Sequence, residues 1–169
     1  MGAENINIGP CTVHYDGQDL GLTKGGVVFK AETETYSSTV DQFGTVKVNE
    51  KIIGRSCSAT VPLVETTLDN LIRVMPGATS VGAGAERRVD VGSGIGTDLL
   101  AGAKKLILHP IEAGTSKEHD VIIHLASPKG GIEFAFEVNK ERIFNVEFAG
   151  FIDTDTGLIF SVGDESASA

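Results

Sequence analysis

The sequence contains no tryptophan, and it has only two tyrosines and two cysteines in 169 residues. A domain that binds a ligand on an open face normally displays exposed aromatic side chains, so their scarcity disfavours a binding module. Cys11 and Cys57 lie in strand-like segments and lack the spacing of a disulfide framework. We therefore expect them to be small buried side chains, in a protein that is made in the cytoplasm.

Basic residues and long apolar runs are scarce too. The chain has 14 lysines and arginines and 23 aspartates and glutamates, which gives a net charge of -9. Such a balance argues against a surface that holds nucleic acid by neutralising phosphates. The N-terminus has neither the basic nor the apolar region of a signal peptide, and all apolar runs are short, so we expect no signal peptide and no membrane span.

The common motifs of catalysis and metal binding are also missing. His119 and His124 are an odd number of residues apart, so on one regular strand they would point to opposite faces and could not share a metal ion. The glycine-rich run at 92–97 lacks the lysine of a phosphate-binding loop and the spacing of a dinucleotide motif. The carboxylates at 153–157 are typical of turn caps rather than of a calcium loop. We predict no catalytic site, no metal site, no cofactor and no enzyme.

What the sequence has is glycine, at 21 residues, between short runs of valine, isoleucine, threonine and phenylalanine. This composition predicts one all-β domain over residues 1–169, a β-sandwich or barrel. The expected strands share period-2 alternation or a short apolar run: 11–15, 19–22, 26–38, 55–62, 87–91, 104–109, 119–126, 132–139, 144–152 and 158–162.

The stretch 26–62 organises the chain, because it contains two long extended segments joined by a long loop. Val27 and Phe29 alternate with polar residues in the first segment, and Cys57, Ala59 and Val61 do so in the second. The loop, residues 40–53, is polar and punctuated by glycine, yet it contains six apolar side chains. Apolar residues on a long loop indicate a contact with a partner.

One amphipathic helix is predicted near residues 66–75. Thr66, with Asp69 three residues later, resembles a capping box, and Pro76 follows the last helical residue. The expected packing face consists of Leu68, Leu71, Ile72 and Met75.

Three further segments are expected to be irregular. Residues 1–10 form an N-terminal arm, and residues 77–103 form a loop rich in glycine with one strand-like island at 87–91. Residues 164–169 form a short polar tail that we expect to be disordered.

Three segments together resemble the tail tube (major tail) proteins of long-tailed bacteriophages. They are GPCTVHYDGQDLGLTKGGVVF at 9–29, VDQFGTVKVNEKIIGR at 40–55 and VPLVETTLDNLIRVMPGAT at 61–79. The resemblance is specific over about the first half of the chain and extends to the second half only in its rhythm of strands.

The resemblance implies a tail-tube-like fold, a β-sandwich or barrel with one flanking helix, in a protein of the virion tail. Six copies would form a ring, and stacked rings would form the conduit through which the genome is ejected. The implied partners are other copies of the chain, the tail tape measure, tail terminator and tail tip proteins, and double-stranded DNA that passes without specific binding. No membrane is implied.

The resemblance also implies roles for particular residues. In this family the loop between the two long strands reaches the adjacent ring, so the stacking candidates are Val40, Asp41, Gln42, Phe43, Gly44, Val46, Val48, Ile52 and Ile53. An acidic lumen would keep DNA from adhering, and Glu133, Glu137 and Glu147 are lumen candidates because they alternate with apolar residues on expected strands.

Two other functions fit the same sequence. The inner-tube proteins of type VI secretion systems share the ring architecture and carry effectors instead of DNA. A monomeric β-sandwich binding or adhesion module is the alternative from another class, although it lacks the aromatic residues that such a module usually displays.

Overall fold

The computed structural model describes residues 9–133 and 136–167. In this part of the chain β-strands dominate and there is one α-helix, which confirms the all-β class. The elements are β1 (Cys11–Tyr15), β2 (Gln18–Asp19), β3 (Val28–Thr39), the 3-10 turn η2 (Asp41–Phe43), β4 (Lys47–Leu63), α1 (Leu68–Val74), β5 (Ala78–Val81), β6 (Arg88–Val91), β7 (Lys104–Pro110), the 3-10 turn η3 (Ile111–Ala113), β8 (Val121–Pro128), β9 (Phe144–Phe151) and β10 (Phe160–Val162).

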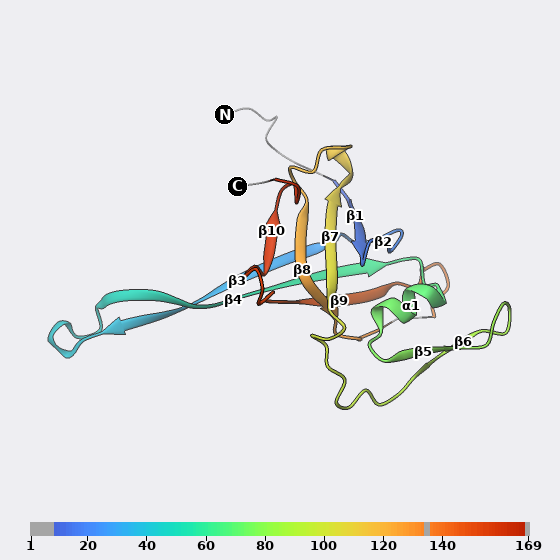
Figure 1. Cartoon of the computed structure of the whole chain (residues 1–169), viewed down its shortest axis with the longest axis horizontal. Helices are drawn as coiled ribbons and strands as arrows, with labels where there is room; N and C mark the ends of the chain where they lie inside the picture. The colour runs from blue at the N-terminus through green and yellow to red at the C-terminus, as the bar shows by residue number, and fades with distance from the viewer. Residues whose placement is uncertain (1–8, 134–135, 168–169) are drawn as a thin grey trace.

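The main sheet is antiparallel and open. Its order is β2-β1-β7-β8-β9-β4-β3, and β10 pairs with the first half of β8. Figure 1 shows β7, β8 and β10 running across β3, β4 and β9, so one sheet bends into two crossing layers. Since β2 and β3 do not pair with each other, the described sheet is a bent sandwich and does not close into a barrel.

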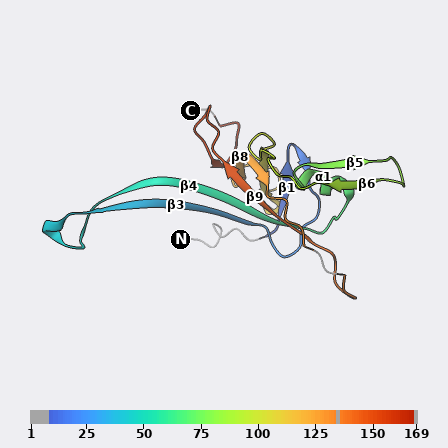
Figure 2. The ribbon, with the colours of Figure 1, turned by 90° about the horizontal axis from the view of Figure 1, so that it is seen from below.

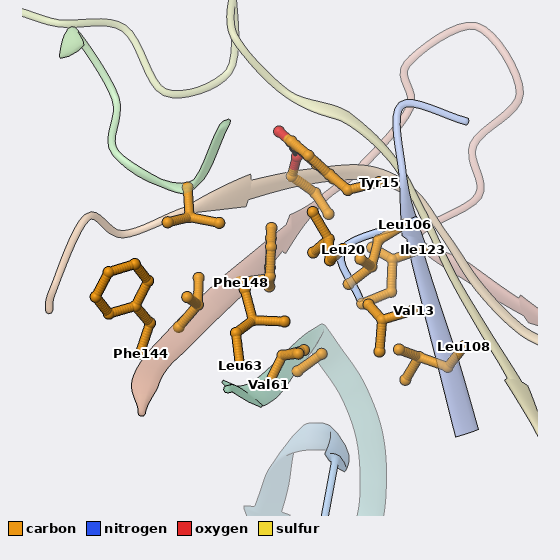
Figure 3. Packing of buried hydrophobic residues seen from close by; sticks show 14 of the residues in the cluster. Val13, Tyr15, Leu20, Val61, Leu63, Leu106, Leu108, Ile123, Phe144 and Phe148 are labelled. Atoms are coloured by element: carbon orange, nitrogen blue, oxygen red, sulfur yellow. Dashed lines mark hydrogen bonds between the residues drawn. The ribbon is translucent and has the colours of Figure 1, made fainter. Parts of the chain in front are cut away.

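The core lies between these layers. Val13, Leu106 and Ile123 come from one layer and meet Val61 and Phe148 from the other, all of them fully buried (Figure 3). The predicted alternation in the second half of β4 is confirmed, because Cys57, Ala59 and Val61 all point into the core. Polar residues alternate with them on the outer face, as a half-buried strand requires.

Tyr15 places a hydroxyl inside this core. The hydroxyl donates a hydrogen bond to the carbonyl oxygen of Ala126 at 3.1 Å, and the ring packs 5.1 Å from the ring of Phe148. Burial, and to a smaller extent the charge of Asp16, raises the pKa of Tyr15 to about 12. The residue therefore stays neutral and fixes β1 over β8.

The first hairpin forms at the predicted Asp16-Gly17 turn. Both residues have positive φ, 53° and 74°, as a two-residue hairpin turn of this kind requires. The returning strand β2 covers only Gln18–Asp19, which is shorter than the predicted 19–22.

Helix α1 is shorter than predicted and presents a different face to the core. Thr67 caps it, not Thr66, and the Thr67 hydroxyl accepts a hydrogen bond from the Asn70 N–H at 3.2 Å. Asn70 and Val74 are the buried residues, whereas Leu68 is 39% exposed. Of the remaining predicted packing residues, Leu71 contacts the core, and Ile72 and Met75 are half-buried. With seven residues, α1, the one α-helix of the described chain, is far shorter than a membrane-spanning helix.

Several predicted boundaries were wrong. The segment 77–103 is mostly irregular, as predicted, and β6 (Arg88–Val91) is the expected strand-like island, but β5 (Ala78–Val81), which pairs with β6 in a separate two-stranded sheet, was not predicted. The expected strand at 132–139 is not formed by its described residues, and residues 134–135 lie outside the described part of the chain. Residues 1–8 of the N-terminal arm and 168–169 of the tail also lie outside it. In the tail, the Asp164 carboxylate accepts from the Ser166 N–H, and Glu165 forms an ion pair with Lys105.

Candidate assembly surface

The most unusual feature of the molecule is a two-stranded arm, which we define as residues 32–56. It consists of the distal parts of β3 and β4, and both views show it extending from the body (Figures 1 and 2). The next strand of the sheet, β9, pairs only with Ser58–Leu63 of β4, so within residues 9–133 and 136–167 no third strand accompanies the arm. No residue of the arm is buried.

The loop predicted at 40–53 is shorter in the structure. Strand β4 begins at Lys47, so Val48, Ile52 and Ile53 lie on a strand and only residues 40–46, which we call the tip, connect the two strands. Sequence reasoning missed this because bulges interrupt the alternation. The register between β3 and β4 shifts twice, and it leaves Ile53 and Val48 without a partner residue on β3.

The tip is a compact turn. The Phe43 N–H donates to the Val40 carbonyl at 3.0 Å, and the Val46 N–H donates to the Phe43 carbonyl at 3.3 Å. Gly44 has φ 63° and ψ -129°, a backbone conformation that favours glycine. These bonds hold Phe43 in a fixed turn with its side chain 65% exposed.

The arm exposes large apolar side chains along its length, and most of them are the predicted stacking residues. A two-stranded hairpin is at best marginally stable alone in water, and exposed apolar patches on a soluble protein mark contact surfaces. Tyr36, also exposed on the arm, was not among the predicted residues. The exposed set is Tyr36, Val40, Phe43, Val46, Val48, Ile52 and Ile53.

Polar contacts across the two strands stabilise the arm. The Glu50 carboxylate accepts hydrogen bonds from Thr35 Oγ1 at 2.8 Å and Ser37 Oγ at 3.2 Å, and Lys47 Nζ lies 3.3 Å away. The Thr35 hydroxyl, and then Lys47, lower the pKa of Glu50, so the carboxylate stays ionised. These contacts join the two strands of the arm.

The three lumen candidates do not lie together on strands. Glu133 and Glu137 belong to the irregular connection between β8 and β9, where Glu137 pairs with Lys140 at 2.5 Å. The prediction that both alternate with buried residues on a strand was wrong, since Phe136 and Val138 are 78% and 89% exposed. Only Glu147 lies on a strand, β9, with its carboxylate 2.6 Å from Lys129 Nζ.

His14 and His109 lie on the neighbouring strands β1 and β7 and line the same pocket. His109 Nδ1 lies 2.5 Å from the buried Asp120 carboxylate, and its Nε2 lies 3.0 Å from the Gly114 carbonyl oxygen. His124 contacts Ser161 instead. In residues 9–133 and 136–167, no group of three or more histidine, cysteine or acidic side chains could hold a metal ion, and both cysteines are free.

No protein-family model matches this chain, and no curated protein matches it. The arm, the tip and the open sheet edge are therefore the features from which a function is inferred.

Proposed function

We propose that this protein is a structural subunit that assembles with copies of itself into stacked hexameric rings, forming the tail tube of a long-tailed bacteriophage. The observation that carries the proposal is the arm. It exposes seven large apolar side chains on an ordered hairpin, and only a partner can remove them from water.

The open sheet supports the same proposal. Strand β3 pairs with β4 alone, so the backbone groups on its outer edge have no strand beside them in the described part of the chain. A long edge of this kind invites pairing with another chain, and closure of a ring removes it. In the proposed tube, the edge of β3 faces a neighbour in the same ring and the arm reaches the next ring.

The outer face of β3, β4 and β9 is the surface we assign to the lumen. The β4 part of this face consists of small polar side chains, because Ser56, Ser58 and Thr60 alternate with the core residues. Its charges are largely paired, as Lys30 with Glu32 and Lys129 with Glu147. Such a face offers DNA few free cations, so a passing duplex would not adhere to it.

The test is to remove the arm and measure assembly. Replacing residues 35–53 with Asn-Gly joins the paired residues Glu34 and Gly54 through a two-residue hairpin turn. Light scattering across a concentration series should show large particles for the wild type and no particle larger than a single ring for the variant.

Thermal unfolding provides the control, because the arm contains no buried residue and the body should unfold within a few degrees of the wild type. Assembly of the shortened protein as readily as the wild type would refute the role of the arm. A wild type that stays monomeric at every concentration would refute self-assembly.

A further inference from the structure

The connection between β7 and β8, residues 111–120, forms one wall of a pocket of about 480 Å³ (top of Figure 1). Ile107 of β7 and Ile122 of β8, which pair with each other, line the pocket from the sheet. Ile123 points into the core, so Ile122 points to the outer face of this layer. Ile122 is nevertheless only 2% exposed, and its burial therefore depends on the segments that lie over the outer face.

His109 ties this connection to the sheet. Its Nε2 lies 3.0 Å from the carbonyl oxygen of Gly114, and its Nδ1 lies 2.5 Å from the carboxylate of Asp120. Asp120 is itself held in place, because it is buried and its carbonyl oxygen accepts a hydrogen bond from the Gly163 N–H at 2.8 Å. Gly114 belongs to a turn within the connection, where its N–H donates to the Ile111 carbonyl at 3.2 Å.

The two contacts of His109 respond differently to the loss of a proton. In the charged imidazole both nitrogens donate, and both acceptors are satisfied. The neutral ring has one N–H, which stays on Nδ1 because the Asp120 carboxylate is the stronger acceptor. The lone pair of Nε2 then faces the oxygen of Gly114, and this contact becomes repulsive. Proton loss therefore breaks the contact with Gly114 and leaves the contact with Asp120 in place.

We propose that His109 is a pH-dependent tether for residues 111–119, which it holds against the sheet while charged and releases when it loses its proton. Release opens the pocket and exposes Ile122 to water. The inference goes beyond the proposed tube and does not depend on it, because the tether lies within one chain. Monomeric protein is therefore sufficient for the test.

Other titratable and charged groups surround the His109 ring. They are His14 of β1, Lys117 and Asp120 of the connection, and Glu165 of the tail, which forms an ion pair with Lys105 of β7. Histidine is the side chain that ordinarily titrates near neutral pH, so another histidine nearby could produce a similar response. The two to control for are His14 and His119, which is exposed in the connection itself.

The test is methyl NMR relaxation at several pH values. The methyl group of Ala113 is attached directly to the backbone of the connection, so its order parameter should fall from about 0.85 to below about 0.6 as His109 loses its proton. Relaxation dispersion of the same methyl group detects release on the slower timescale. Because the hydrogen bonds to Asp120 and then Gly114 raise the pKa of His109, we expect release above about pH 6.5. The methyl group of Ala126, fully buried in the core, should stay rigid throughout.

Asp120→Asn separates the tether from a general effect of pH. The asparagine amide can donate to Nδ1, so a neutral His109 carries its proton on Nε2 and still donates to Gly114. The Asp120→Asn variant should therefore keep Ala113 rigid across the whole pH range.

Three histidine variants complete the experiment. His109→Gln removes the titrating group and should abolish the pH dependence of Ala113, whereas His14→Gln and His119→Gln should retain it. An Ala113 methyl group that stays rigid while His109 loses its proton would overturn the tether. So would a pH dependence that survives in His109→Gln, that disappears in His119→Gln, or that is as large in Asp120→Asn as in the wild type.

Discussion

At the scale of single residues, Asn70 shows how one buried polar side chain determines the position of an element. Its Nδ2 donates hydrogen bonds to the carbonyl oxygens of Leu20 and Glu65, both at 2.9 Å. These bonds join α1 to the segment after β2 and to its own leading turn. A buried amide with satisfied hydrogen bonds is costly to remove, because the carbonyl groups would lose their donors.

Asn70→Ala should lower the free energy of unfolding by about 2 kcal/mol. The control is Asn49→Ala, because Asn49 is exposed on the arm and its replacement should change stability by less than about 0.5 kcal/mol. Urea denaturation of both variants measures the difference. Equal losses would show that the two hydrogen bonds of Asn70 contribute nothing specific.

His109 and Asp120 predict a dependence of stability on pH. The Asp120 carboxylate and the Gly114 carbonyl are both acceptors, so His109 satisfies both only when each ring nitrogen carries a proton. The hydrogen bond to Asp120, and then the bond to Gly114, raise the pKa of His109 in the folded protein. This contribution is fully present below the unfolded pKa and is lost as the pH rises through the folded pKa.

The wild type should therefore be more stable than Asp120→Asn by an amount that shrinks as the pH rises above about 6.5, with a change on the order of 1 kcal/mol. Unfolding experiments at several pH values measure this difference, and an NMR titration of His109 should show a lower pKa in the variant. A difference that stays constant from pH 6 to pH 9 would contradict the assignment.

These residue pairs were beyond what the sequence alone could predict. Asn70 lies on a helix whose apolar residues predicted a different buried face. The helical spacing of apolar residues also does not tell whether an asparagine between them is buried or exposed. His109 and Asp120 are separated by a loop, so their proximity depends on how 111–120 folds. In contrast, the Asp16-Gly17 turn was predictable, because its geometry depends on local backbone preferences.

At the scale of elements, the contact between β4 and β9 leaves no room for a side chain at one position. A Cβ atom at Gly150 would overlap Sγ of Cys57 and approach Cγ2 of Ile123 to 3.1 Å. The close approach brings β9 against the buried half of β4, just where the arm leaves the body.

Gly150→Ala should therefore destabilise the protein by roughly 1–3 kcal/mol, since it overpacks the core. Combining it with Cys57→Ala should cost less than the sum of the single changes, because the smaller side chain makes room. Gly54→Ala is the control: the nearest atom to its Cβ is Glu34 Oε2 at 3.9 Å, so it should be neutral or slightly stabilising. Strict additivity would rule out the steric explanation.

The arm was only partly predictable for a physical reason. Alternation is clear from Cys57 to Val61, where one face is buried, and the sequence identified that strand correctly. From Lys47 to Ile53 both faces are exposed and two bulges interrupt the pairing, so no burial pattern enforces a period of two. Sequence reasoning identified the apolar residues of 40–53 but described the whole stretch as loop, whereas its second half is strand.

At the scale of the whole molecule, the arm projects from one end of a bent open sheet and α1 lies toward the other end (Figure 1). A pocket lies beside the C-terminal end of α1. Composition predicted the all-β class, which is confirmed, and the apolar residues of 40–53 predicted a partner, which stays a prediction. The two layers cross because β8 pairs with β7, with β10 and, through its second half, with β9. The position of the pocket depends on that crossing. Neither feature has a local signal in the sequence.

Electron microscopy of the wild-type protein in negative stain, at increasing concentration, tests the central claim most directly. The proposed assembly predicts hollow tubes built of stacked rings, with sixfold symmetry in end views. Solid fibrils, closed dimers or monomers at every concentration would contradict it.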